Sequence, residues 1–359
     1  MNKTRELHVG LDVSLAETHI CILDEKGRTV CETVAVTDPD AVSQALEPFA
    51  DGIARVGLEA SSIAGWLHGE LADMGYPMIL VEAYHMRTSL NAQRNKTDRT
   101  DAMGIAQMMR MGWFRAVHAK SEDSQQARLL LTNRRLLKRK LIDMENHIRG
   151  VLRAQGLFMG GVTRRTFAER VLELLETCEP AMQSFVGTML NVRNHMLEGY
   201  NDLHRLVIEL VRRDPLCRRF MDIPGVGPIA ALSFKAGVDD PHRFKRSRTV
   251  GAHFGLTPGR WQSGTIDRDR RISKMGDREV RTALCEAAAS LLLRSQTWTA
   301  LKAWGMRIAQ KTSMMNAIVA VARKLAVIMH RMWVDDTKYL RGKGAKVLQK
   351  RKLTPPGMA

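Results

Sequence analysis

The 359-residue sequence lacks several features that would place it in common protein classes. Its five cysteines are scattered, with no Cys-x-x-Cys pair and no His/Cys cluster, so neither a zinc site nor a disulfide framework is indicated. No apolar run at the N terminus resembles a signal peptide, and the richest late apolar segment is broken by Arg323 and Lys324. We therefore expect a soluble protein of the reducing cytoplasm, with no membrane as partner.

Acidic residues are scarce beyond the first third of the chain. Residues 1–110 hold 10 Lys and Arg against 16 Asp and Glu, a net charge of −6, whereas residues 111–359 hold 45 against 22, a net charge of +23. A cationic surface of that size favours a polyanion as partner, because each neutralised phosphate releases counterions. The alternative is a basic protein whose charge serves only solubility.

The first 110 residues alternate between strand and helix patterns. Three consecutive strands predict an antiparallel meander, and helix, strand, helix, strand and helix follow it. That order is the order of the RNase H-like fold, so we expect an α/β domain at the N terminus. The predicted strands are residues 7–14, 18–25, 28–36, 55–61 and 76–83. The predicted helices are residues 38–50, with a start between Asp38 and Asp40, 62–75 and 97–112.

Beyond residue 120 the pattern is mostly helical. Two apolar runs with spacings of three and four residues predict coiled-coil seams, which pack either within the chain or between chains. The first seam is Leu137, Leu141, Met144, Ile148 and Val151. The second seam is Met182, Phe185, Met189, Val192, Met196, Gly199, Leu203, Leu206 and Leu210.

The last third resembles a separate, mainly helical domain. The stretch IPGVGPIAALSF matches the glycine turn of helix-hairpin-helix modules, where backbone N–H groups approach a phosphate. Residues 341–352 hold six basic residues and no acid, which indicates a disordered tail that contacts nucleic acid. The domains we expect are residues 1–115, 120–215, 216–335 and a basic tail at 336–359.

Four acids fall on elements that an RNase H-like sheet brings together. Asp12 lies near the end of the first strand, Glu59 near the end of the fourth, and Asp98 and Asp101 on one face of the last helix. Taken singly, each could be a strand end, a cap or a solvated charge. Together they repel one another unless a cation binds, which predicts a site for Mg²⁺, or two ions ~4 Å apart, suited to phosphoryl transfer.

A second signal is a serine in a strongly basic stretch. Between Pro241 and Arg281 there are 11 Lys and Arg against 4 Asp and Glu, and Ser263 lies there before Gly264. Such a serine is ordinarily a turn residue, and nothing local supplies a base to activate it. The predicted phosphate contacts are Lys96 and Arg99 near the acids, and Arg243, Lys245, Arg246, Arg248, Arg260, Arg268, Arg270, Arg271 and Lys274 around the serine.

Six motifs in this order and spacing resemble the IS116/IS110/IS902 family of transposases, which is related to Piv-type DNA invertases. The motifs are NKTDRTDA, GLDVS, LEAS, IPGVGP, GLTPGRWQSG and ISKMGDREVR, and they span essentially the whole chain. The resemblance implies an N-terminal RuvC-like domain, a helical middle and a C-terminal transposase domain. One departure is that residues 60–62 are Ala-Ser-Ser, where the family often has threonine and glycine after the glutamate.

The resemblance also implies a composite active site. In it Asp12, Glu59, Asp98 and Asp101 bind Mg²⁺ or Mn²⁺, and Ser263 is the nucleophile that forms a phosphoserine bond with DNA. The implied partners are donor and target DNA, a structured noncoding guide RNA, and further copies of the chain as a dimer or a tetramer on DNA, at the nucleoid of a bacterial or archaeal cell.

Three other hypotheses compete with a recombinase. A RuvC-like nuclease would use the acids for hydrolysis and leave the serine structural. A sugar-kinase-like ATPase shares the GLDVS motif, but that fold needs a second duplicated domain, which we do not find in this sequence. An inert nucleic-acid scaffold would bind in a salt-sensitive way without cleaving strands.

Overall fold

The computed structural model describes residues 6–90, 97–264, 266–340 and 348–350. The chain divides into two compact units, residues 1–120 and 121–359. The separate domains expected at 120–215 and 216–335 both lie in the second unit, and their boundary stays a prediction. Of the helices that the structure describes, none is both long and apolar enough to cross a membrane.

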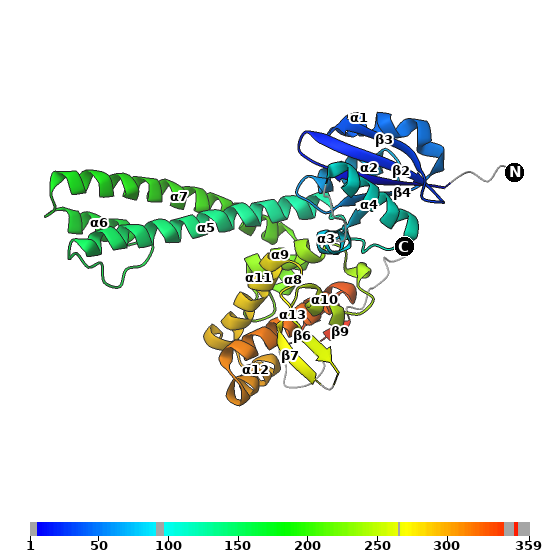
Figure 1. The fold of residues 1–359 in the computed structure, drawn as a ribbon. Helices are drawn as coiled ribbons and strands as arrows, with labels where there is room; N and C mark the ends of the chain where they lie inside the picture. Colours follow the sequence, from blue (N-terminus) through cyan, green and yellow to red (C-terminus); the bar gives the residue numbers. More distant parts are fainter. Residues whose placement is uncertain (1–5, 91–96, 265, 341–347, 351–359) are drawn as a thin grey trace, which may run out of the picture. The chain divides into compact units, whose positions relative to one another are not determined.

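The first unit is built on a five-stranded sheet with the order β3-β2-β1-β4-β5 (Figure 1). β1 pairs antiparallel with β2 and β2 with β3, whereas β1, β4 and β5 run parallel. This meander followed by parallel strands confirms the predicted order of elements. The strands are β1 (Leu7–Val13), β2 (Glu17–Asp24), β3 (Thr29–Val36), β4 (Ile53–Glu59) and β5 (Met78–Val81).

Helices cover both faces of this sheet. Alternate residues of the strands, such as Val9 and Leu11, are buried with α1 and α2, and the opposite face, which includes Cys21 and Leu23, packs on α4. The fifth strand ends at Val81, and the chain then forms a helix, α3, that the sequence pattern did not predict. The helices are α1 (Pro39–Leu46), the 3₁₀ turn η1 (Glu47–Gly52), α2 (Ala64–Asp73), α3 (Ala83–Leu90) and α4 (Asp98–Met111).

The second unit is mainly helical and includes two short two-stranded sheets. Its helices are α5 (Glu122–Ala154), α6 (Phe167–Leu175), α7 (Pro180–Arg213), α8 (Pro215–Phe220), α9 (Pro228–Val238), η2 (Pro241–Arg243), α10 (Arg248–His253), α11 (Arg278–Ala289), the π-helical η3 (Ser290–Arg294), α12 (Ala300–Lys311) and α13 (Met314–Val334). Its strands are β6 (Pro258–Ser263), β7 (Ile266–Ile272), β8 (Thr337–Tyr339) and β9 (Leu348–Lys350).

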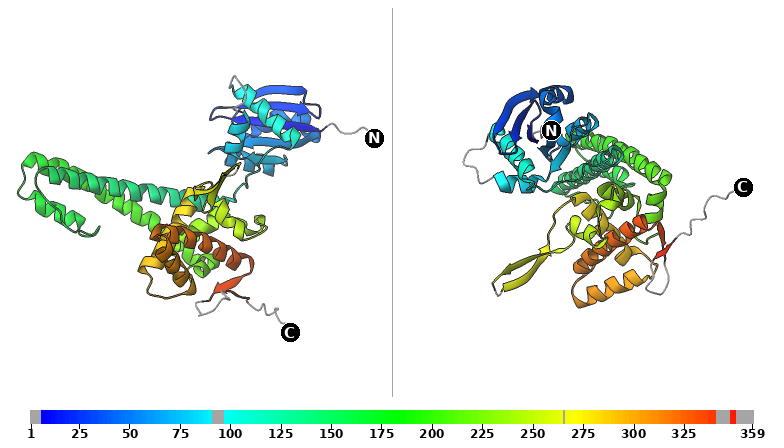
Figure 2. Two further views of the ribbon diagram at one scale, coloured as in Figure 1. Left: turned by 60° about the horizontal axis from the view of Figure 1, so that its bottom comes forward. Right: turned by 90° about the vertical axis from the view of Figure 1, so that its right-hand side faces the viewer.

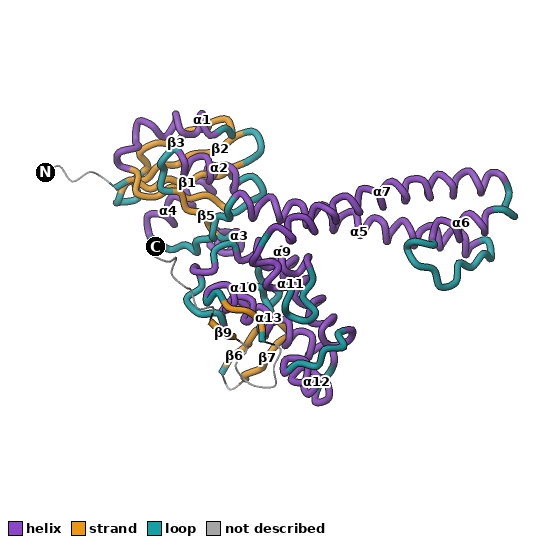
Figure 3. The backbone as a smooth tube through the Cα atoms, turned by 180° about the vertical axis from the view of Figure 1, so that it is seen from behind, coloured by secondary structure: helices purple, strands orange, loops and turns teal. Residues whose placement is uncertain are grey.

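The two long helices α5 and α7 pack side by side as a hairpin within the chain (Figure 3). Leu141 and Ile148 of the predicted α5 seam are fully buried, as expected. Phe185 and Val192 of the predicted α7 seam are about half exposed, so this part of the seam does not pack within the chain, and its packing between chains stays a prediction. The residues of α7 that are buried are Met182, Val186, Leu190, Arg193, Val207 and Val211.

A buried ion pair explains why the apolar pattern of α7 misleads. Arg193, only 2% exposed, donates to Glu145 of α5 at 2.7 Å and to the carbonyl of Arg164 at 2.8 Å. Its guanidinium also lies 5.0 Å from the ring centre of Phe167. The contact face of α7 therefore has a charged residue at its centre, which a search for apolar spacing passes over.

The glycine turn between α8 and α9 is a packing element. Gly225 has φ +90°, and a Cβ there would lie 2.6 Å from the carbonyl oxygen of Ala287 and 2.7 Å from the amide nitrogen of Leu291. The turn is thus held against the end of α11, a close approach that only glycine permits. A phosphate contact at this helix-hairpin-helix-like turn stays a prediction.

The basic tail differs from the expected disordered segment at two places. Thr337 and Tyr339 of β8 are buried, and β8 pairs antiparallel with β9 at residues 348–350. Residues 341–347 and 351–359 of the predicted tail lie outside the described residues.

Candidate active site

Two neighbouring parallel strands end in the same pattern, Gly-Leu-acid. β1 carries it at residues 10–12 and β4 at residues 57–59, and the pairing register places the two glycines opposite each other. Because side chains alternate between the faces of a strand, both leucines enter the core under α1 and α2. Asp12 and Glu59 therefore share the face that α4 covers, as the sequence analysis predicted.

The glycines of this pattern allow α4 to approach the sheet closely (Figure 2). A Cβ at Gly10 would lie 2.1 Å from the carbonyl oxygen of Ala102 and 2.4 Å from the amide nitrogen of Ala106, both in the α4 backbone. A Cβ at Gly57 would meet the side chain of Met109 at 2.7 Å. On each strand, the glycine that contacts α4 lies two residues before the acid. These contacts therefore fix the position of α4 relative to Asp12 and Glu59.

The first turn of α4 supplies the second pair of acids. Thr97 and Thr100 form a capping box, in which each side chain accepts a hydrogen bond from the other's backbone amide. Asp98 and Asp101 follow at positions where the helix dipole favours negative charge. Asp101 is 8% exposed, whereas Asp98 is open to solvent and lies 3.9 Å from the Nε2 atom of His19.

The electrostatic effect of this convergence is concentrated on Asp12. Its pKa is raised to about 6, first by burial and then by the negative charges of Asp101, Asp98 and Glu59. The nearby His19, which is opposite Asp12 across the β1–β2 pair, lowers the pKa and offsets part of the rise. An acid whose ionised form is disfavoured by burial and by several neighbouring carboxylates is typical of a functional site.

The donor set of this site fits a hard divalent cation. Two carboxylates at the strand ends and two on the first turn of α4 offer the oxygen ligands that Mg²⁺ and Mn²⁺ prefer, and a cation would relieve the repulsion that raises the pKa of Asp12. In the part of the chain that the structure describes, no three Asp, Glu, His or Cys side chains are close enough together to hold a metal as they stand.

The second unit presents Ser263 at the end of a two-stranded hairpin. Ser263 is the last residue of β6 and pairs with Ile266 of β7, and Gly264 between them has φ +56°. The serine is exposed, and the position that a Cβ of Gly264 would take is open. The strands extend away from the helices of their unit (Figure 2), so the sequence-predicted turn holds the hydroxyl where a large substrate can reach it.

Basic and aromatic side chains cover the strands that carry this serine. The guanidinium of Arg270 lies 4.4 Å from the ring centre of Trp261, which is itself 54% exposed. Arg260 forms an ion pair with Asp267 across the hairpin, with a 2.8 Å contact, and this pairing lowers the pKa of Asp267. Arg268 is exposed opposite Trp261, so the hairpin offers guanidinium groups to a phosphate backbone.

The other predicted phosphate contacts are placed unequally. Arg99 forms an ion pair with Glu32 of β3. Arg243 donates to the carbonyls of Val238 and Gly237 at the end of α9, and burial lowers its pKa, so its first role is to cap that helix. Lys245, Arg246, Arg248, Arg271 and Lys274 are exposed. Lys96 lies outside the described residues.

Sequence reasoning missed His19 at the acid cluster and a second basic surface in the second unit. Arg323 and Lys324 served in the sequence analysis only to exclude a membrane span, yet both are exposed and line a groove with Arg248 and Trp304. The available signal was their phase, since they lie on one side of a helix whose other side is apolar.

The chain matches two family models in succession. A transposase model of the IS110 DEDD type matches residues 9–155, and a model described as the transposase IS116/IS110/IS902 family matches residues 217–303. The acids Asp12, Glu59, Asp98 and Asp101 fall in the first match, and Ser263 falls in the second.

Curated relatives extend this likeness. The transposase for insertion sequence element IS1111A from Coxiella burnetii is 29% identical over 338 residues, which cover 93% of this chain and 91% of that protein. The transposase for IS1328 from Yersinia enterocolitica is 24% identical and covers 67% of this chain and 71% of that protein. The RuvC structure from Thermus thermophilus aligns with 31% of this chain and 99% of its own, at 14% identity and a TM-score of 0.25. With two successive family matches and a relative that aligns along almost its whole length, the chain belongs to the IS116/IS110/IS902 family of transposases.

Proposed function

We propose that this transposase cuts and rejoins the DNA of an insertion sequence through a covalent phosphoserine intermediate at Ser263, with the acids of the first unit completing the active site. The observation that carries the proposal is the acid cluster itself. Asp12 and Glu59 share a sheet face with the first turn of α4, and three neighbouring carboxylates help to raise the pKa of Asp12 to about 6. Repulsion among carboxylates destabilises the folded chain, and a site that binds and cleaves phosphodiesters would explain why these acids are placed together.

The proposed ligands for Mg²⁺ or Mn²⁺ are Asp12, Glu59, Asp98 and Asp101. A bound divalent ion supplies neutralisation of the phosphate charge and stabilisation of the oxygen that leaves. The chain's own contribution is to hold the four carboxylates on one rigid surface, because β1, β4 and α4 are fixed to one another through the close approach at Gly10.

The chemical step at Ser263 is a transesterification. The Oγ atom attacks the phosphorus of a DNA phosphodiester, its proton passes to a base, and the bond from phosphorus to one sugar oxygen breaks with release of that sugar hydroxyl. One phosphate ester bond is lost and one is gained, so the energy for religation is kept. Attack by a hydroxyl of another strand re-forms a phosphodiester and returns the serine hydroxyl.

The basic surface of the second unit supports binding through the DNA backbone. Exposed guanidinium groups on the hairpin flank Ser263. Because contacts to phosphates do not distinguish one DNA sequence from another, recognition of the DNA sequence needs another source. We assign that reading to a structured noncoding RNA that pairs with donor and target DNA, since base pairing supplies specificity that backbone contacts lack.

Strand exchange requires more than one copy of the chain. Four strands must be cut and rejoined, which favours a homo-oligomer, a dimer or a tetramer on DNA. The exposed residues Phe185, Val192, Leu206 and Leu210 of α7 offer an apolar stripe for such assembly. Because the substrate is genomic DNA, we place the protein in the cytoplasm, at the nucleoid of a bacterial or archaeal cell.

The test is to trap the covalent intermediate. A labelled duplex made from the DNA that flanks the gene is incubated with protein, Mg²⁺ and the RNA transcribed from the same flanks, and adducts are separated under denaturing conditions. We expect an adduct with the native chain and with Ser273→Ala, a matched serine just beyond the hairpin, and none with Ser263→Ala. An undiminished adduct in Ser263→Ala contradicts the proposal.

A metal-dependent nuclease is the second candidate, because all four acids belong to the first unit and need no serine to lie together. In that case water, and not Ser263, attacks the phosphate. Ser263→Ala would still nick DNA at the native rate while Asp12→Ala would not, and no protein–DNA adduct would form.

A further inference from the structure

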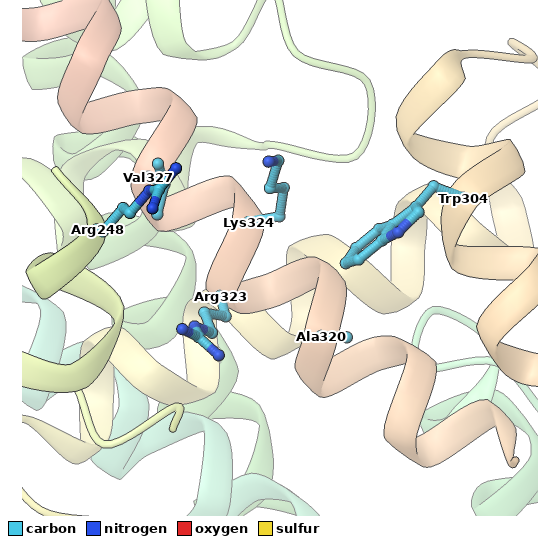
Figure 4. Close-up of a pocket in the computed structure, with 6 residues that line it drawn as sticks. All are labelled: Arg248, Trp304, Ala320, Arg323, Lys324 and Val327. Carbon is cyan, nitrogen blue, oxygen red and sulfur yellow. The ribbon is translucent and has the colours of Figure 1, made fainter. Parts of the chain in front are cut away.

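A groove with basic walls and one aromatic end lies in the second unit, apart from the serine hairpin in sequence. It has a volume of about 470 Å³ and is lined by Arg248 of α10, by Trp304 of α12 and by residues of α13 (Figure 4). A second hollow of about 460 Å³ shares Arg248, Lys324 and Val327 with it and continues to Arg331. The two form one surface, which we call the α13 groove.

The residues of α13 that line the groove recur along one face of the helix. Ala320, Arg323, Lys324, Val327 and Arg331 follow the spacing of residues that share a helix face, and they extend about 16 Å along the axis at ~1.5 Å per residue. The charged residues alternate with small apolar ones. This arrangement suits a chain of repeating anionic and apolar groups better than a single small anion.

The groove's charge is not neutralised from within. In the described part of the chain, neither hollow is lined by an aspartate or a glutamate. Among the described residues, Arg331 alone of the groove's cations has a carboxylate within 4 Å, that of Asp335 at 3.8 Å, one turn further along α13. Three exposed cations, Arg248, Arg323 and Lys324, therefore face the same hollow, and their mutual repulsion favours an anionic ligand.

Gly251 fixes one wall of the groove. A Cβ at this buried residue would lie 2.8 Å from Cγ of Arg323, so the missing side chain lets the stem of Arg323 rest against α10. A stem held by packing loses less rotamer freedom when its guanidinium binds a phosphate. The position of Arg323 is thus prepared before a ligand arrives.

Trp304 gives the groove an aromatic wall from a separate helix. Its indole is 36% exposed and faces the part of α13 that carries Ala320 and Lys324 (Figure 4). An indole face can stack on a base only where the base's own face is uncovered, which excludes the interior of a duplex. Cations beside a stacking platform are the combination by which proteins hold single strands.

From these contacts we infer that the α13 groove binds a single-stranded segment of nucleic acid, with its phosphates on Arg248, Arg323 and Lys324 and one unpaired base on Trp304. The inference rests on the proposed function, because it takes nucleic acid as the ligand and assigns it a strand that recombination leaves unpaired. That strand is either displaced DNA or a loop of RNA, and both present the same phosphate and base chemistry to the groove.

The aromatic contact is tested with Trp304→Ala in the full chain. Binding of labelled oligothymidine, oligouridine and a mixed-sequence duplex of equal length is measured by fluorescence anisotropy. We expect single-strand affinity to fall about 5- to 150-fold, the range for loss of one base stack, while duplex affinity stays within about twofold. Trp298→Ala removes a more exposed tryptophan, 67% accessible, outside the groove and is the matched control.

The outcomes of that comparison are decisive. Equal losses with Trp304→Ala and Trp298→Ala, or equal losses for duplex and single strands, overturn the inference. A loss confined to oligouridine assigns the groove to RNA, and a loss confined to oligothymidine assigns it to a DNA strand. Native affinity of Trp304→Ala for both oligomers also overturns it.

The phosphate contact is tested through salt dependence. Lys324→Ala should lower the slope of log K against log salt for oligothymidine by about 0.7, the value for one phosphate contact on a single strand. Lys26→Ala removes an exposed lysine from the turn after β2, at the end of the first sheet away from Asp12, and should leave the slope unchanged. An unchanged slope in Lys324→Ala contradicts a phosphate at this position.

Failure here is separable from failure of the proposed recombinase. If Trp304→Ala binds single strands normally while Ser263→Ala abolishes the covalent adduct, the groove is wrong and the recombinase stands. If no Ser263-dependent adduct forms but Trp304→Ala still loses single-strand binding, the groove stands and the phosphoserine mechanism is wrong.

Discussion

The two units of this protein hold charge of opposite sign, and they hold it in different ways. Residues 1–120 hold 12 Lys and Arg against 16 Asp and Glu, a net charge of −4, and four of the acids gather where α4 covers the sheet, with Asp101 among them buried. Residues 121–359 hold 43 Lys and Arg against 22 Asp and Glu, a net charge of +21, and most basic side chains of the hairpin and the groove are exposed.

Concentrated and dispersed charge serve different ends. The crowded carboxylates change the protonation chemistry of one group, Asp12, which is what a reaction centre requires. Exposed cations each contribute a small, salt-dependent share of binding to a polyanion. We therefore expect the acids of the first unit, together with Ser263, to govern the rate of strand cleavage, and the exposed cations of the second unit to govern affinity.

The largest expected effect separates rate from affinity. Asp12→Asn should lower Mg²⁺-dependent strand cleavage by ~10³-fold or more, the loss typical when one member of a catalytic set is removed. Its duplex affinity should stay near native, because the change removes negative charge. Arg268→Ala should do the reverse, with lower affinity and a salt slope reduced by about 0.9. Single-turnover cleavage and anisotropy titrations measure the two quantities.

Asp40→Asn, an exposed acid in the first turn of α1, is the control for charge alone. The comparison breaks if Asp12→Asn cleaves at the native rate, or if Arg268→Ala lowers the cleavage rate of saturated complexes as strongly as Asp12→Asn does.

The second prediction concerns the buried ion pair between Arg193 and Glu145 in the second unit. Arg193→Ala leaves Glu145 buried without its closest cation, and we expect the free energy of unfolding to fall by ~3–5 kcal/mol. The double variant Glu145→Leu/Arg193→Met should recover most of that loss, because two apolar side chains need no charge balance. Urea unfolding followed by helical circular dichroism measures each variant.

The exposed pair Arg170–Glu173, 2.9 Å apart on α6, provides the matched control. Arg170→Ala should cost less than ~1 kcal/mol, since solvent screens such pairs. Equal losses at Arg193 and Arg170 would show that burial does not set the value of the pair.

The third prediction returns to the first unit and its close contact with α4. Gly10→Ala should destabilise the unit by ~1–3 kcal/mol and lower cleavage, because the new Cβ would meet helix backbone that cannot move aside. Gly57→Ala should cost less, since Met109 is a flexible side chain. Gly69→Ala, in the open interior of α2, should be neutral or stabilising by up to ~1 kcal/mol. Thermal unfolding of the three variants ranks them.

A Gly10→Ala variant as stable as the native chain would show that α4 is not held against β1, and the basis for the acid cluster would be lost with it. Reduced cleavage without reduced stability would instead place the effect in the orientation of Asp98 and Asp101.

These three cases show which properties a sequence can predict. The strands of the first unit were predictable because a two-residue period of burial is a local pattern, and Asp12 and Glu59 could be placed together because strand order fixes which ends are neighbours. The close approach at Gly10 was not predictable, because it depends on where α4 crosses the sheet. The helix α3 was missed for a different reason, because it is short and its residues show little amphipathic periodicity.

Charges in the second unit were predicted by number but not by role. The sequence identified its basic residues, yet could not distinguish Arg243, whose guanidinium caps α9, from Arg248, which faces a hollow. In α7 the apolar spacing predicted a seam one position away from the buried face, because the true face includes Arg193. The role of each of these arginines depends on contacts with residues that are distant in the sequence.

The smallest expected effect is on how far the stability of the second unit falls at acidic pH, and it concerns His330. His330 is 1% exposed, and its Nε2 atom lies 2.9 Å from the carbonyl of Pro241, to which the neutral ring donates. Its Nδ1 atom lies 3.0 Å from Oγ of Ser247 and accepts from that hydroxyl. These bonds fix the loop that leads into α10 and the α13 groove.

Burial lowers the pKa of His330 below its ordinary value. The hydrogen bond to Pro241 and the charge of Asp335 raise the pKa by less, and the charges of His242 and Arg243 lower it further. The unfolded chain therefore binds this proton more readily than the folded chain. The stability that His330 contributes is fully present above about pH 6.5, the unfolded value, and is lost as the pH falls through the lower folded pKa.

His330→Gln should consequently reduce the loss of stability between about pH 7.5 and about pH 5.5 without abolishing it, since glutamine keeps one donor and one acceptor but cannot take up the proton. His147→Gln, on the exposed face of α5, should leave the pH dependence unchanged. Urea midpoints at the two pH values measure the difference. If both variants lose stability on acidification as steeply as the native chain, the acid response of the second unit arises elsewhere, and the loop beside the groove is not held by a neutral histidine.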